Sequence, residues 1–241
     1  MHVDTQLEAA LRALDHWPRF RLRLFFEGIV VGILSGTVIS FFRWGLEMGT
    51  VWRQWIYANV LASGGVLLNL SWFGVLLAAA LLLWRLGIYE PNAGGSGIPQ
   101  VKGVILGAIR MRWLRILWVK LIGGIVGIGL GLSLGREGPS IQIGAVTAQG
   151  LSRALGRTRI TAGASAGLAA AFNAPLAGVM FALEELHRNF SGVVLAPSMA
   201  AALLATMVSR YVFGRAPVFH FNYWLGRRRL QQGFAEYSLF L

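Results

Sequence analysis

The sequence predicts an all-helical membrane protein built from broken and tilted transmembrane helices. Of its 241 residues, 56% are hydrophobic and only 13% are charged, and the mean hydropathy is +0.61. Apolar stretches long enough to cross a hydrocarbon core of about 30 Å recur along the chain. Glycine and proline interrupt several of these stretches, and none shows the alternation that is typical of a strand.

The first elements are expected to be long and uninterrupted. Residues 1–20 are expected to form an amphipathic arm in the cytoplasm, because arginines gather there. A membrane helix is expected from about 22 to 50 and a second from 64 to 87, which contains the uncharged run from Val66 to Trp84. Each is long enough to span a bilayer.

Glycine and proline divide the middle of the chain into shorter helices. The segment from Pro91 to Pro99 holds three glycines and two prolines, which end one helix and start a short one that runs to about Ile109. Two further breaks are expected, at Gly135–Pro139 and Asn173–Pro175. The remaining helices are expected over about 113–134, 139–155, 158–172, 175–189 and 193–213.

A stripe of glycines predicts close helix packing. Gly123, Gly127, Gly131 and Gly135 recur at every fourth residue, which places them on one face of a helix. Small residues on such a face let a neighbouring backbone approach closely. This stripe therefore predicts packing rather than ligand binding.

The net charge of +12 does not indicate a nucleic-acid partner. The basic residues gather where apolar stretches stop, as at Arg110, Arg112 and Arg115, which is typical of loops beside a lipid bilayer. The positive-inside rule places this loop and the N-terminal arm in the cytoplasm. The chain has no cysteine and its four histidines lack metal-ligand spacing, so we expect neither a metal site nor a cofactor.

Two of the breaks predict an anion site inside the membrane. An ionisable side chain there is a candidate functional residue, and Glu137 lies in an otherwise apolar region, beside Arg136. Each break also starts a helix, whose first N–H groups lack internal partners and attract anions. Two such ends, meeting near Ser96, would bind an anion without any full positive charge and release it readily. The alternative is that Glu137 only caps its helix and pairs with Arg136.

Three motifs in this order resemble the CLC family of chloride channels and proton-coupled chloride transporters. They are Gly95–Pro99, Gly135–Pro139 and Gly167–Gly178. The resemblance implies that residues 21–213 form the first half of an inverted-repeat fold. Residues 214–241 would be an atypical tail, with the second repeat missing. We expect such a half to fold poorly or to be inactive by itself; a fragment, a frameshift and a true truncation all remain open.

The resemblance also implies which residues bind chloride. Ser96 would donate its hydroxyl to a central chloride. Backbone N–H groups of Arg136, Glu137 and Gly138 would line an outer chloride site, and those of Gly95 and Ser96 an inner one. The Glu137 side chain would be the gate, which enters the anion path when ionised and leaves it when protonated.

Glu184 and Glu185 are candidates for proton transfer. Taken alone, they are typical of a helix leaving the membrane. In the CLC pattern, however, the second position is a glutamate in many proton-coupled exchangers, so Glu185 would be an inner proton acceptor and Glu184 would support it. A passive voltage- or pH-gated channel is the alternative within the family. The serine at position 96 favours chloride over fluoride.

The alternative from another class is an intramembrane serine hydrolase. Gly163–Gly167 matches the nucleophile-elbow pattern around Ser165, and His187 is the candidate base. That motif needs a strand before the serine, whereas an alanine- and glycine-rich helix is expected here. We therefore expect a transporter and not an enzyme. The implied partners are chloride, protons, the lipid bilayer of a bacterial-type plasma membrane and a second copy of the chain.

Overall fold

The computed structural model describes residues 2–59, 64–151, 157–188 and 191–214, with side chains from residue 22 on except at 157 and 158. These residues are helical and contain no strand. The helices are α1 (His2–Asn59), α2 (Val66–Tyr89), the 3-10 helix η2 (Pro91–Ala93), α3 (Ile98–Ile105), α4 (Trp113–Gly129), α5 (Glu137–Leu151), α6 (Arg157–Phe172), α7 (Pro175–Phe181), the π-helix η3 (Ala182–His187) and α8 (Gly192–Phe213).

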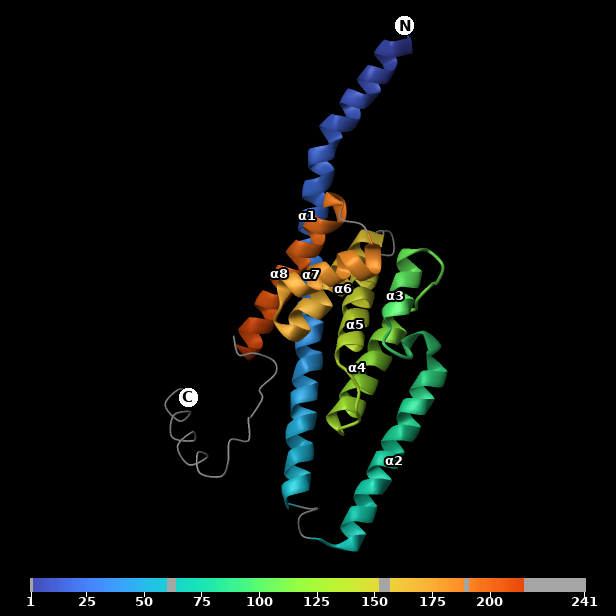
Figure 1. Cartoon of the computed structure of the whole chain (residues 1–241), viewed down its shortest axis with the longest axis vertical. Helices are drawn as coiled ribbons and strands as arrows, with labels where there is room; N and C mark the ends of the chain where they lie inside the picture. The colour runs from blue at the N-terminus through green and yellow to red at the C-terminus, as the bar shows by residue number, and fades with distance from the viewer. Residues whose placement is uncertain (1, 60–63, 152–156, 189–190, 215–241) are drawn as a thin grey trace, which may run out of the picture.

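The predicted helical fold class is confirmed. Three described helices, over Leu22–Asn59, Val66–Tyr89 and Gly192–Phe213, are long and apolar enough to cross a membrane. Figure 1 shows α1 running the length of the molecule, α8 lying across it, α5 and α6 in the middle, and α2 standing apart. Only Ala79 of α2 is buried, so the apolar surface of this helix suits contact with lipid.

Several helix boundaries differ from those expected. Residues 2–20, expected to form a separate arm, are part of α1, which continues without a break to Asn59. α4 ends at Gly129 rather than near 134, because the chain turns at Gly131, where φ is +93°. The expected helix over 175–189 is divided into α7 and η3, because the wider π-turn starts at Ala182. The tail expected at 214–241 lies outside the described residues beyond Gly214.

Close helix packing does occur, but the predicted glycine stripe does not provide it. A Cβ added to Gly123 or Gly127 would meet α2 only at ordinary contact distance, 3.5 Å from Leu83, and Gly131 and Gly135 lie beyond the end of α4. The backbones approach elsewhere.

One close approach joins α1 to α8. A Cβ added to Gly28 would lie 2.8 Å from the Cα of Pro197. The next two glycines on this face, Gly32 and Gly36, have only 2.8 and 2.7 Å to the Cα atoms of Ala201 and Ala205. Three contacts at a spacing of four residues on both helices fix their register.

The second close approach joins α5 to α6. A Cβ added to Gly144 would lie 2.9 Å from the Cα of Gly167, and closer still to the carbonyl oxygen of Gly163. The residues around this contact are buried, including Ile143 and Ala166. This contact sets the position of α5, which carries Glu137 in its first turn.

We expect Gly144→Ala to destabilise the protein by about 1–3 kcal/mol, the usual cost of overpacking. The added methyl group would have to push α6 away from α5. The measurement is the loss of folded protein on heating in detergent. Gly74→Ala is the matched control, because a Cβ at Gly74 of α2 meets nothing within 4 Å. Equal stability of the two variants would contradict the assigned packing.

Candidate functional site

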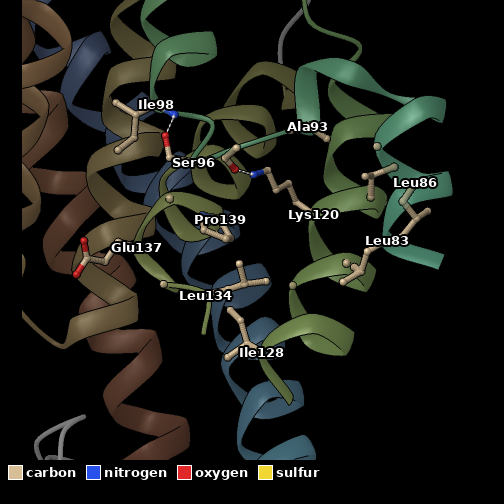
Figure 2. Close-up of a pocket in the computed structure, with 18 residues that line it drawn as sticks. Leu83, Leu86, Ala93, Ser96, Ile98, Lys120, Ile128, Leu134, Glu137 and Pro139 are labelled. Atoms are coloured by element: carbon tan, nitrogen blue, oxygen red, sulfur yellow. Dashed lines mark hydrogen bonds between the residues drawn. The ribbon is translucent and has the colours of Figure 1, made fainter. Parts of the chain in front are cut away.

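The two glycine-rich breaks meet in the structure. A Cβ added to Gly138 would lie 2.7 Å from the Cα of Ser96 and closer still to the Ser96 carbonyl oxygen. Both residues line one cavity of about 550 Å³, together with Gly95, Glu137 and Lys120 (Figure 2). The sequence motifs therefore lie side by side, as the anion-site hypothesis requires.

The first break is held by two glycines in the left-handed region. Gly95 has φ +61° and Gly97 has φ +82°, a conformation that other residues rarely adopt. Between them, the Oγ of Ser96 accepts a hydrogen bond from the N–H of Ile98 at 3.3 Å. A hydroxyl that accepts one hydrogen bond still has its own proton to donate, so Ser96 can face a ligand in the cavity.

Lys120 is a site residue that the sequence analysis missed. Its side chain extends from α4 into the cavity, and its Nζ donates a hydrogen bond to the carbonyl oxygen of Gly95 at 2.7 Å (Figure 2). The residue is only 6% exposed. Lys120 thus brings an amino group to the cavity, which the expectation of a site without any full positive charge did not include. The available signal was that Lys120 is the only charge between Arg115 and Arg136.

Glu137 stands between two cavities. It lines the cavity that contains Ser96 and also a neighbouring one of about 720 Å³, which Arg136, Glu47 and Phe172 line as well. Its side chain is exposed, and Figure 2 shows the carboxylate pointing away from Ser96 and Lys120.

Arg136 faces the second cavity rather than the first. Its guanidinium lies over the ring of Phe172, 5.3 Å from the ring centroid. Arg43, Glu47 and Glu137 act on it electrostatically. The Arg136 side chain is therefore part of a charged neighbourhood at the second cavity.

The two candidate proton-transfer residues lie outside both cavities. Glu184 and Glu185 belong to η3, and their side chains are exposed. The carboxylate of Glu185 accepts a hydrogen bond from the Nζ of Lys102, on α3, at 3.1 Å. The structure thus brings Gly95, Ser96, Glu137 and Gly138 together, but it does not bring the acids of η3 into their cavity.

Ser165 lacks the surroundings of a nucleophile elbow. It is fully buried in α6, and its hydroxyl donates a hydrogen bond to the carbonyl oxygen of Ser198 at 3.4 Å. No strand precedes it in the described part of the chain. Its position therefore favours a packing role over a catalytic one.

Interrupted membrane helices whose ends meet at a shared cavity are typical of transport proteins with discontinuous helices. The model of the voltage gated chloride channel family matches residues 74–239. The chain therefore belongs to this family, the CLC family, and it is a multi-pass membrane protein.

Its relatives include named exchange transporters. The chain is 34% identical over 200 residues to the H⁺/Cl⁻ exchange transporter ClcA of Vibrio cholerae, covering 78% of this chain and 41% of that protein. It is also 34% identical over 221 residues to ClcA of Salmonella schwarzengrund, covering 86% and 46%. The chain spans less than half the length of these curated relatives.

Solved structures agree with this assignment. The fold matches a slow cyanobacterial Cl⁻/H⁺ antiporter with a TM-score of 0.72 and 32% identity, over 90% of this chain and 53% of that one. It matches a CLC-type fluoride/proton antiporter with a TM-score of 0.64 and 28% identity, over 80% and 47%.

The contact between the two breaks can be tested with a pair of glycine variants. We expect Gly138→Ala to destabilise the protein in detergent by about 1–3 kcal/mol, because the methyl group would push Ser96 away from α5. Gly135→Ala is the control, since a Cβ at Gly135 meets nothing within 4 Å, and should have a much smaller effect. A Gly138→Ala protein as stable to heating as Gly135→Ala would show that the contact is dispensable.

Proposed function

We propose that this chain forms part of a chloride transporter that exchanges chloride for protons across a bacterial plasma membrane. The observation that carries the proposal is the single cavity shared by Ser96, Lys120 and Glu137. The names of the relatives support the exchange of these two ions. Because the chain covers less than half of its curated relatives, the complete transport path is proposed to need a second repeat.

Chloride is proposed to bind where the two helix starts meet. The hydroxyl of Ser96 donates to a central chloride, and the N–H groups of Gly95 and Ser96 line an inner chloride site. The N–H groups of Arg136, Glu137 and Gly138 line an outer chloride site, where the dipole of α5 adds about half a positive charge. These donors replace part of the hydration shell of the ion while still letting it leave.

Lys120 is proposed to add a fixed cation to this site. An ammonium group has three donors, and one of them is used by the carbonyl of Gly95. The other two are available to the cavity. Lys120 thus holds the turn that carries Ser96 and attracts an anion to it.

Glu137 is proposed to be the gate. As a carboxylate it competes with chloride for the N–H groups at the start of α5, and as a neutral carboxyl it does not. Its position between the two cavities supports this role. Binding of a proton to Glu137 and binding of chloride to the donors that it leaves would thereby be linked.

Protons are proposed to reach Glu137 from Glu185, with Glu184 supporting it. The position of both acids outside the cavity of Ser96 is consistent with a proton route that separates from the chloride route. Chloride rather than fluoride is proposed as the anion because position 96 is a serine. The active form is proposed to be a homodimer with one pore in each subunit.

A passive chloride channel is the second candidate, and the match to the voltage gated chloride channel family favours it. Paired measurement of chloride and proton flux distinguishes the two. We expect the protein carrying both repeats, in liposomes, to move protons uphill when a chloride gradient is applied. Chloride movement without linked protons would refute exchange and leave the channel.

We expect Glu137→Gln to abolish proton coupling, because the amide is permanently neutral and cannot carry a proton. Chloride-driven proton movement should fall below detection, while chloride binding, measured by titration calorimetry, persists. Persistent proton pumping by this variant would remove Glu137 from the mechanism.

We expect Glu185→Val to separate the two fluxes. Chloride movement should persist and uphill proton movement should disappear, because valine cannot take up a proton. Glu184→Val is the comparison and should reduce coupling less. If Glu185→Val still pumped protons at the wild-type ratio, the inner acceptor would have to lie elsewhere.

A further inference from the structure

Lys102 and Glu185 form an ion pair that the proposed proton route does not use. The Nζ of Lys102 lies 3.1 Å from Oε1 of Glu185, across 83 positions of sequence. The side chains are 25% and 48% exposed. The pair is therefore open to water, and its two partners come from different elements.

The backbones on both sides of this pair are held by one core. Val101 and Ile105 of α3 are buried in the same cluster as Ala182 and Leu186 of η3. The backbone positions of Lys102 and Glu185 are consequently held relative to each other by this cluster. Such a pre-set geometry favours a defined contact over a transient one.

Lys102 also connects the pair to the anion site through α3. The short helix begins at Ile98, whose N–H donates to the Oγ of Ser96, and Lys102 lies in its last turn. The turn that carries Ser96 therefore lies at the start of α3, a helix of eight residues. Lys102, which pairs with Glu185, lies near the end of the same helix.

The other elements packed against η3 offer Glu185 few charges. The titratable neighbours within or next to η3 are Glu184, His187 and Arg188. α7 has no titratable residue. Among the described side chains of α6, Arg159 donates to Glu27 at 2.8 Å. The arginine of α8, Arg210, donates to Asn173.

We propose that Lys102 is a positioning residue for Glu185, an inference that rests on the proposed function. Its ammonium holds the Glu185 carboxylate against α3 and competes with the proton for it. When a proton from water binds the carboxylate, Glu185 becomes a neutral carboxyl. Lys102 keeps its own protons and turns to solvent. Each proton that passes through Glu185 therefore breaks and re-forms this pair.

The test measures exchange in liposomes, with both repeats present, as a function of pH on the side that Glu185 faces. In Lys102→Met, the proton concentration at half-maximal exchange should fall about two- to fivefold, the range for a partly exposed ion pair. Lys102→Arg, which keeps the charge, should behave like the wild type. In a Glu185→Gln background, where chloride movement should persist without proton coupling, Lys102→Met should leave the pH dependence of chloride movement unchanged. An unchanged profile in Lys102→Met, or a shift that persists without Glu185, would overturn the inference.

A second measurement separates this inference from the proposed function. The infrared band of protonated Glu185, identified by its loss in Glu185→Gln, should appear at higher pH in Lys102→Met than in the wild type. If the wild type shows no chloride-driven proton flux, exchange is refuted. The pH at which the infrared band appears in the wild type and in Lys102→Met still shows whether Lys102 competes with the proton for Glu185. Identical bands in both proteins would overturn the inference even if exchange is confirmed.

Discussion

Inside a bilayer, every backbone group that a helix break sets free has to find a partner in protein or in a wet cavity. Here the breaks before α3 and α5 face a common cavity, and the bare Cα of Gly138 rests on the backbone of Ser96. The remaining features of the site follow from that contact. Ser96, Glu137 and Lys120 share a cavity because these two helix starts cannot be moved apart without exposing their polar groups.

Small residues place the broken helices accurately enough for this contact to form. Lipid tails are as apolar as leucine, so association of membrane helices relies on packing rather than on the hydrophobic effect. The Gly144 contact with α6 positions α5. The glycines of α1 hold α8, which in turn packs on α6. The site thus depends on glycines that touch no ligand.

The sequence was sufficient to predict the breaks and the meeting of Ser96 with Glu137, because glycine and proline act locally and the motifs carried a family resemblance. It was insufficient for contacts that depend on tertiary packing. The glycine stripe of α4 suggested close packing, but Gly131 adopts a positive φ and ends the regular face. Neither Lys120 nor Lys102 could be placed from the sequence, since nothing local to a lysine identifies the carbonyl or carboxylate that it will meet.

The two lysines of the chain contact different partners, because Lys102 pairs with a carboxylate and Lys120 with a backbone carbonyl. This difference bears on how the proposed transporter would bind an anion without trapping it. A buried ammonium beside Ser96 would by itself bind an anion too tightly for release, because attraction grows as the surroundings become less polar. The bond from Lys120 to the Gly95 carbonyl offsets part of that charge. A compact ammonium with several donors can serve both the carbonyl and the ion. In the proposed transporter, the anion would then have one shared full charge and several weak dipoles as partners, and a competing carboxylate at Glu137 would displace it.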